Sequence, residues 1–284
     1  MNTTKPVAMV TEPAPNATTR PIVVAINAVR RCGQTLELAS ALAWHLGADL
    51  EVVFVEDANL LRLADLPVTR EIDRFSGMSR DLDSQRVLRA LHSEARQLRR
   101  EVSRLDKATS VRSTVRVVRG HYFTEALTAS ANVDVTFVHG AGQPFPGDHR
   151  PGPRLGARSA TREAAAGRAK RPPLWALFDG SPASARALRL AAKLAYTSAA
   201  NLVVLVPEQA AGEIENRKRE ARMAADTADL QFLVVAGDGL SQLGGALTPR
   251  AGSVLVLARQ SPELKDDRTR GNLESLTVPV VLVA

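Results

Sequence analysis

The sequence contains only one cysteine, Cys32, among 284 residues. A disulfide framework or a cysteine-rich metal site is therefore excluded, and a reducing, cytoplasmic setting is expected. The five histidines form no pair four residues apart and no short cluster, so no metal site is predicted. A Gly-x-Ser-x-Gly nucleophile motif is also absent, and we predict no catalytic residues.

Long apolar runs are missing as well. The longest uncharged runs, such as residues 194–207, fall short of the roughly 18 to 20 residues that span a bilayer, so no membrane association is expected. The apolar patch within residues 1–19 is shorter than the apolar core of about 7 to 15 residues in a signal peptide. We expect residues 1–19 to form a disordered tail.

The clearest structural pattern lies between Arg171 and Pro207. Leu174 to Phe178 reads as a buried strand, Ser181-Pro182 as the start of a helix, and Leu202 to Val206 as a second strand. A strand, a crossover helix and a parallel strand form a right-handed βαβ unit, which predicts an open parallel sheet covered by helices.

The same unit occurs earlier in the chain. Shifting the sequence by 152 residues places residues 21–55 on 173–207 without a gap, and apolar positions fall on apolar positions. This match favours a duplication. We predict an α/β protein of two tandem Rossmann-like domains, at 20–140 and 172–284, joined by a linker at 141–171.

The two predicted copies differ in two respects. Residues 56–82 form an insertion found only in the first copy, and its leucines Leu60, Leu61, Leu63 and Leu66 are expected to pack against something. The final strand, Val278 to Val283, belongs to the second copy, and the first copy has no equivalent of it. Between the insertion and residue 107, an apolar stripe with arginines opposite predicts a helix that packs on the sheet.

The net charge of +7 raises the possibility of nucleic-acid binding. The predicted linker holds seven basic and two acidic residues, so five of the seven excess positive charges lie there. No set of aromatic side chains or recognition motif accompanies this charge, and specific nucleic-acid binding is not expected. A solvated basic linker is the favoured interpretation.

These features together resemble the universal stress protein family in its tandem form. The resemblance rests on Phe178-Asp179-Gly180-Ser181, on the strand-glycine-helix passages at Gly120 and Gly237, on Asn132 to Val135, and on the terminal VPVVLVA. The family's fold is an open five-stranded parallel sheet with helices on both faces. Some members bind an adenine nucleotide and others do not, so the fold alone does not define the function.

The resemblance implies particular residues for a nucleotide site. Binding members carry an Asp after the first strand, which Asp179 matches, and a Gly-x2-Gly-x9-Gly-[Ser/Thr] loop after the fourth. The corresponding loop positions here are Ala258, Ser261, Gly271 and Asn272, so the spacing is kept while two glycines and the hydroxyl are lost. These five residues are the candidate site for ATP or AMP, and the alternative is a degenerate loop that only closes the sheet. The first copy has Asn27 in place of Asp179.

The sequence predicts a non-catalytic regulatory or binding protein of the universal stress type in a bacterial stress or metabolic response. One alternative is an adenine-nucleotide-binding protein or slow ATPase that uses the second copy. Another is a scaffold that binds a protein through the leucine-rich insertion. Cys32, beside Arg30 and Arg31, is either a reactive thiol or an early helix residue.

A homodimer is also predicted, joined through the final strand Val278 to Val283. In the family the fifth strand lies at the sheet edge and pairs with its equivalent in a second domain. An exposed apolar strand edge is prone to aggregation, so we expect another strand to pair with it. Pairing of the strand with its equivalent in a second chain is self-complementary. The alternative is burial of this strand against the first domain of the same chain.

Overall fold

The computed structural model describes residues 20–29, 32–72, 76–139, 172–208, 210–227, 230–235, 253–261 and 278–284, together with residues 264, 271, 273 and 276. The tail predicted at 1–19 and the linker predicted at 141–171 lie outside the described residues. None of the described helices is long and apolar enough to cross a membrane.

The first half of the chain alternates strands and helices, as its apolar pattern predicts. Its elements are β1 (Ile22–Ile26), α1 (Gly33–Leu46), β2 (Leu50–Asp57), α2 (Ala58–Ala64), β3 (Arg70–Ile72), β4 (Ser79–Asp81), α3 (Ser84–Thr109), β5 (Ser113–Gly120), α4 (Tyr122–Ser130) and β6 (Val135–Val138). Helix α1 ends where Gly47 adopts a left-handed φ of 60°, which glycine reaches without strain. At the start of α3, the Asp83 side chain accepts a hydrogen bond from the Gln85 N–H.

The second half repeats this alternation more briefly. Its elements are β7 (Pro173–Leu177), α5 (Pro182–Ser198), β8 (Asn201–Pro207), α6 (Ala211–Ala225), β9 (Gln231–Val235), β10 (Val254–Ala258) and β11 (Val280–Val283). The predicted start of α5 is confirmed, because the Ser181 side chain accepts a hydrogen bond from the Ser184 N–H and Pro182 follows it.

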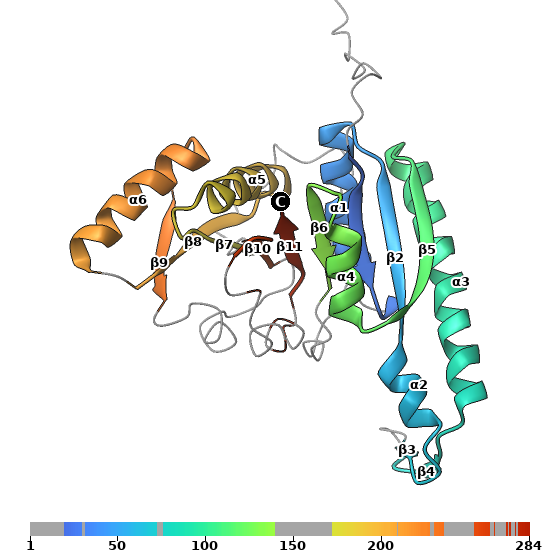
Figure 1. Cartoon of the computed structure of the whole chain (residues 1–284). Coiled ribbons are helices and arrows are strands. Elements are labelled where there is room, and N and C mark those ends of the chain that lie inside the picture. Colours follow the sequence, from blue (N-terminus) through green and yellow to red (C-terminus); the bar gives the residue numbers. More distant parts are fainter. Residues whose placement is uncertain are drawn as a thin grey trace, which may run out of the picture.

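The main strands form one sheet of nine strands, in the order β5-β2-β1-β6-β11-β10-β7-β8-β9 (Figure 1). Within each half all neighbouring strands are parallel, and the two halves are wound alike around β1 and β7. The predicted α/β fold class is thereby confirmed. The halves share one continuous sheet, so the division into two independent domains stays a prediction.

The position of β11 corrects the predicted dimer. β11 pairs in parallel with β10 on one side and antiparallel with β6 on the other, where Val280 lies opposite Val138 and Val283 opposite Val135. Both edges of β11 are therefore occupied within the chain, and a second chain cannot pair with it. The prediction of a homodimer through Val278 to Val283 is wrong, and the alternative of burial against the first half is correct. β11 thus serves as the fifth strand of both halves.

Helices cover the two faces of the sheet unequally. α1, α3, α5 and α6 pack on one face, and the apolar cluster beneath them runs through both halves without interruption. The other face is covered by α4 in the first half and by Leu264, Leu273 and Leu276 in the second. The inner strands β1, β6, β10 and β11 are buried on both faces, which explains their continuous apolar runs.

The predicted insertion forms an arm that projects beyond the sheet. The arm, residues 57–83, contains α2 and the antiparallel hairpin of β3 and β4, and Figure 1 shows it at the lower right, below the sheet. It begins after β2 and leads into α3, which α2 contacts. The expectation that its leucines pack is met only in part: Leu61 packs against the core, while Leu60, Leu63 and Leu66 are exposed.

Because β11 belongs to both half-sheets, we expect the chain to unfold in a single transition. Val281 is fully buried on β11, and Val281→Ala should lower the free energy of unfolding by about 2 kcal/mol. In a Trp44→Phe background, Trp175 fluorescence follows the second half alone, while circular dichroism follows the whole chain. The two signals should change together in urea. The exposed control Tyr196→Ala should change stability by less than about 0.5 kcal/mol. Two separate transitions, one of them unaffected by Val281→Ala, would contradict a shared strand.

Candidate functional site

The predicted nucleotide site lies where the strand order of the second half reverses. β7 has β8 on one side and β10 on the other, and the carboxyl ends of these parallel strands meet at one edge of the sheet. Asp179 follows β7, Ala258 ends β10, and Ser261 comes three residues later. The structure therefore brings Asp179, Ala258 and Ser261 to the same edge. Gly271 is exposed, and Asn272 lies outside the described residues.

Asp179 is held in a fixed orientation as a carboxylate. Its Oδ1 accepts a hydrogen bond of 2.8 Å from the Ser181 N–H. Partial burial opposes ionisation, but hydrogen bonds from Ser184 and Ser181 outweigh it and lower the pKa of Asp179 below its ordinary value. The ionised group therefore contributes stability above its unfolded pKa, and this contribution is lost as the pH falls through the lower folded pKa.

Gly180, the next residue, lets a cation approach the backbone closely. Its φ of 84° lies in the left-handed region, and a Cβ at this position would collide with the guanidinium of Arg217 on α6. Arg217 therefore packs directly against the backbone after Asp179. A glycine here satisfies both the backbone conformation and the close approach of the arginine.

The loop after β10 uses its backbone N–H groups within the protein. The Arg259 N–H donates to the Val283 carbonyl at 2.7 Å, and the Ser261 N–H donates to the Ala258 carbonyl at 3.1 Å. A phosphate-binding loop needs such groups to point at the ligand. Ser261 is also buried, with 4% of its surface exposed. These contacts favour the interpretation that this part of the loop closes the sheet.

Arg259 instead connects the two halves. Its Nη1 donates to the carbonyls of Ser130 and Val133, which lie at the carboxyl end of α4 in the first half. The last carbonyls of a helix lack partners within the helix and carry partial negative charge, so a guanidinium is well placed there. The sequence analysis missed this role, because nothing in the local sequence identifies a partner more than a hundred residues away.

The equivalent position in the first half is filled by a buried polar network. His139, just after β6, lies 3.1 Å from the Thr35 hydroxyl through its Nδ1 atom. The His139 N–H donates to the Tyr122 hydroxyl at 2.7 Å, and this hydroxyl donates to the Ala25 carbonyl at 2.8 Å. These side chains are almost fully buried, so the carboxyl ends of β1 and β6 are joined by the protein's own hydrogen bonds.

Cys32 is the residue that precedes α1, and its thiol donates to the Val29 carbonyl at 3.0 Å. Burial raises the pKa of the Cys32 thiol to about 12, although a backbone hydrogen bond acts in the opposite direction. The thiol is therefore neutral at physiological pH. The interpretation as a reactive thiol is therefore wrong, and Cys32 is instead the buried N-cap residue of α1.

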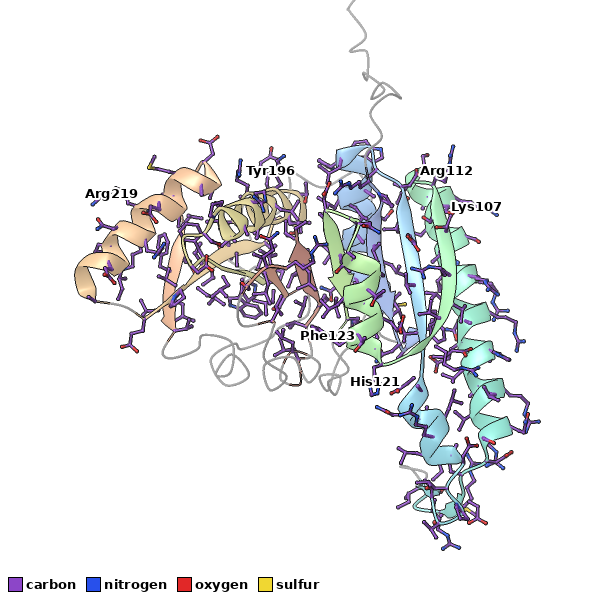
Figure 2. All side chains as sticks on the ribbon, viewed as in Figure 1. Lys107, Arg112, His121, Phe123, Tyr196 and Arg219 are labelled. Atoms are coloured by element: carbon purple, nitrogen blue, oxygen red, sulfur yellow. The ribbon has the colours of Figure 1, made fainter. Side chains whose placement is uncertain are left out.

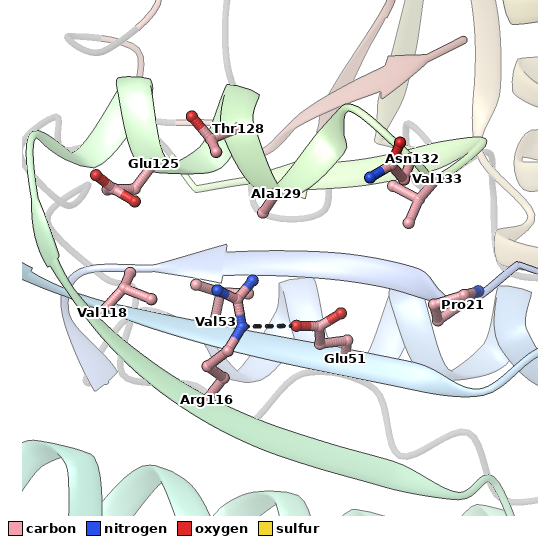
Figure 3. Close-up of a pocket in the computed structure, with 10 residues that line it drawn as sticks. All are labelled: Pro21, Glu51, Val53, Arg116, Val118, Glu125, Thr128, Ala129, Asn132 and Val133. Atoms are coloured by element: carbon pink, nitrogen blue, oxygen red, sulfur yellow. Dashed lines mark hydrogen bonds and ion pairs between the residues drawn. The ribbon is translucent and has the colours of Figure 1, made fainter.

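A groove of about 400 Å³ lies between α4 and the outer strands β2 and β5 (Figure 3). Its floor carries an ion pair in which Arg116 Nε is 2.9 Å from Glu51 Oε1, and Thr128 on its wall donates to the Thr124 carbonyl. These polar groups are already satisfied by one another. Within the described residues, no group of three or more His, Cys, Asp and Glu side chains could hold a metal ion.

Comparisons with known proteins find similarity among solved structures. No family model and no curated protein sequence matches the chain. A solved universal stress protein from Archaeoglobus fulgidus is similar over 92% of this chain and 95% of its own, with 11% identity and a TM-score of 0.49. A putative universal stress protein from Pseudomonas aeruginosa is similar over 94% and 93%, with 15% identity and a TM-score of 0.44. A universal stress protein in complex with cAMP matches 40% of this chain and 96% of its own, with 24% identity and a TM-score of 0.32.

These similar structures are universal stress proteins, and they cover most of the chain in the first two cases. The fold is established by the chain's own strand order, in which the second half has five parallel strands ordered β9-β8-β7-β10-β11. This is the open five-stranded parallel sheet that the resemblance implied.

We expect Arg259→Met to destabilise the chain by about 1 to 3 kcal/mol, because it removes charge-assisted hydrogen bonds to the end of α4. The measurement is the free energy of unfolding in urea. Arg112→Met is a suitable control, since Arg112 is exposed and its side chain has no hydrogen bond or ion pair among the described residues. Equal stability of the Arg259 variant and the control would show that the contact contributes nothing to joining the halves.

Proposed function

We propose that this chain is a non-catalytic binding protein of the universal stress type, acting in the cytoplasm of a bacterium in a stress or metabolic response. We further propose that the arm, residues 57–83, is the surface through which it binds a partner protein. The observation that carries this proposal is the concentration of exposed apolar side chains on the arm.

Eleven large apolar side chains are exposed among the described residues, and six of them belong to the arm. These six are Leu60, Leu63, Leu66, Val68, Ile72 and Met78. Exposed apolar side chains scattered singly need no explanation, but a contiguous group marks an interaction surface. At the equivalent place in the second half, β8 leads to α6 after a connection of only three residues. The arm is therefore not required by the repeated fold.

The charges around these side chains indicate the chemistry of the partner. Arg80 pairs with Glu71 across the hairpin at 2.8 Å, and Arg70 pairs with Asp81 at 3.4 Å. The hairpin charges are thus of both signs and paired with one another. An apolar centre with a balanced polar rim is the composition of a protein–protein interface. The partner surface should accordingly be apolar at its centre rather than strongly charged.

The arm can be tested by photo-crosslinking in cells of the source bacterium. A benzophenone amino acid in place of Val68, which is 85% exposed, should give a discrete product with one protein. The matched control carries the same probe in place of Tyr196, which lies in the second half and is 88% exposed. This control should give no discrete product.

Binding of the purified partner to the Leu63→Ser/Leu66→Ser variant should be at least about tenfold weaker, or 1.4 kcal/mol. Products of equal yield from both probe positions, or unchanged affinity of the double variant, would reject the arm as the binding surface.

A second candidate function is binding of an adenine nucleotide, ATP or AMP, in the second half, with slow ATP hydrolysis as an extension. The specific observation in its favour is the ionised and oriented Asp179 at the strand reversal, where open α/β sheets bind ligands. The hydrogen-bonded loop N–H groups argue against tight phosphate binding, so the nucleoside would provide most of the contacts.

Calorimetric titration with ATP and AMP tests this second candidate. If the nucleoside binds through Asp179, Asp179→Ala should weaken binding at least about tenfold, because a hydrogen-bonded carboxylate is lost. The matched control is Asn27→Ala at the equivalent position of the first half, which should leave the affinity unchanged. Absence of heat from the parent protein at millimolar nucleotide would end this proposal without affecting the arm.

A further inference from the structure

The solvent side of α3 carries a row of cations. One side of this helix packs on the sheet through Val87, Leu91, Ala95, Leu98 and Val102. The opposite side exposes a set that we call the basic stripe, namely Arg96, Arg99, Arg100, Arg104 and Lys107. At 1.5 Å per residue, the stripe extends over about 16 Å. Figure 2 shows Lys107 on the outer side of the first half, with Arg112 beyond it at the same end.

Most of the stripe lacks a counter-charge. Arg104 pairs with Glu101 at 2.8 Å. No carboxylate among the described residues forms an ion pair with the other four members, Arg96, Arg99, Arg100 and Lys107. A shallow hollow of about 370 Å³ lies over the same surface, lined by Arg99, Arg100, Ser103, Arg104 and Lys107.

Earlier arginines on the same helix behave differently. Arg86 lies 3.9 Å from Glu71, and Arg89 lies 3.9 Å from Asp83. The unpaired members of the stripe therefore lie between Arg96 and the carboxyl end of α3. Interaction with the helix dipole favours a cation only in the last turn, so it accounts for Lys107 but not for Arg96, Arg99 or Arg100.

The second half provides an internal comparison. α6 occupies the same place in the repeat, between the second and third strands, but three of its four cations have partners among the described residues, Arg219 being the exception. Lys218 pairs with Glu215 at 2.6 Å, Arg217 pairs with Glu220 at 3.5 Å, and Arg222 lies over the ring of Phe232 at 4.8 Å. The fold at this position does not require a row of unpaired cations. Among the described residues, the basic stripe distinguishes the first half from the second.

The surroundings of the stripe indicate what it binds. None of the large exposed apolar side chains among the described residues belongs to α3. The stripe therefore lacks the apolar centre of a protein interface and the apolar anchors that a helix inserts into a membrane surface. A row of cations without apolar side chains is complementary in charge to a polyanion whose charges are regularly spaced. At 3.4 Å of axis per phosphate, about five phosphates of one strand of a duplex lie along 16 Å.

We propose that the basic stripe of α3 binds the phosphate backbone of double-stranded nucleic acid without reading its sequence. This activity goes beyond the proposed functions of the arm and of Asp179, because it uses neither. It is also compatible with the expectation from the sequence that specific nucleic-acid recognition is absent, since contacts to phosphates carry no sequence information.

The test is fluorescence anisotropy of a labelled DNA duplex of about 20 base pairs and arbitrary sequence, titrated with the full chain between about 50 and 200 mM salt. The variant Arg96→Gln/Arg100→Gln/Lys107→Gln removes three cations of the stripe. Each phosphate contact contributes about 0.9 to the slope of log affinity against log salt, so the slope should become shallower by about 3. Affinity at the lowest salt should fall at least about tenfold. All three side chains are exposed, and circular dichroism would verify that the variant is folded.

A matched control removes the same number of charges elsewhere. Arg150→Gln/Arg154→Gln/Arg158→Gln lowers the net charge equally within residues 141–171 and should change the slope by less than about 1. An equal loss in both variants would attribute binding to net charge and overturn the proposal. So would the absence of duplex binding by the parent protein at about 50 mM salt. Binding to phosphatidylserine vesicles, but not to the duplex, would assign the stripe to a membrane surface instead.

Discussion

The structure depends on the pairing of β11 with strands of both halves. Without it, β6 would end the first half-sheet as an apolar open edge, since β6 is fully buried in the present arrangement. The carboxyl end of β11 is also fixed: the Ala284 N–H donates to the Asp134 carbonyl, and Arg186 on α5 donates to the Ala284 carbonyl. One strand therefore completes two half-sheets, and the apolar core beneath α1, α3, α5 and α6 becomes continuous.

This arrangement changes the meaning of the loop between β10 and β11. In nucleotide-binding members of the family that the sequence resembles, the corresponding loop contacts phosphate. Here the loop leads into the strand that joins the halves, the N–H groups of Arg259 and Ser261 bond to protein carbonyls, and the Arg259 side chain contacts the end of α4. A loop with these structural contacts has less freedom to adapt to a ligand, because each contact would have to be broken or preserved during binding.

The features that we associate with function lie where the two halves differ. The arm and the basic stripe both belong to the first half, and α3 connects them because it begins at the arm and carries the stripe near its other end. The arm exposes apolar side chains among balanced charges, whereas the stripe exposes cations without apolar side chains. These opposite compositions suit different partners, a protein for the arm and a polyanion for the stripe. The repeated sheet supplies a rigid support for both surfaces.

The sequence by itself determined the local elements and the repeat. Apolar runs marked the strands and Ser181-Pro182 marked the start of α5, because these signals depend only on neighbouring residues, and the fixed offset predicted two copies. Only the tertiary structure decided that β6 pairs with the edge of β11 that β10 leaves open. The sequence of a strand does not show which strand lies at either of its edges. The tertiary structure also decided that the carbonyls bound by Arg259 lie in the other half, that Cys32 is buried, and that the stripe on α3 lacks counter-charges. Such contacts join residues far apart in the chain, and their partners are fixed by the packing of the halves rather than by local pattern.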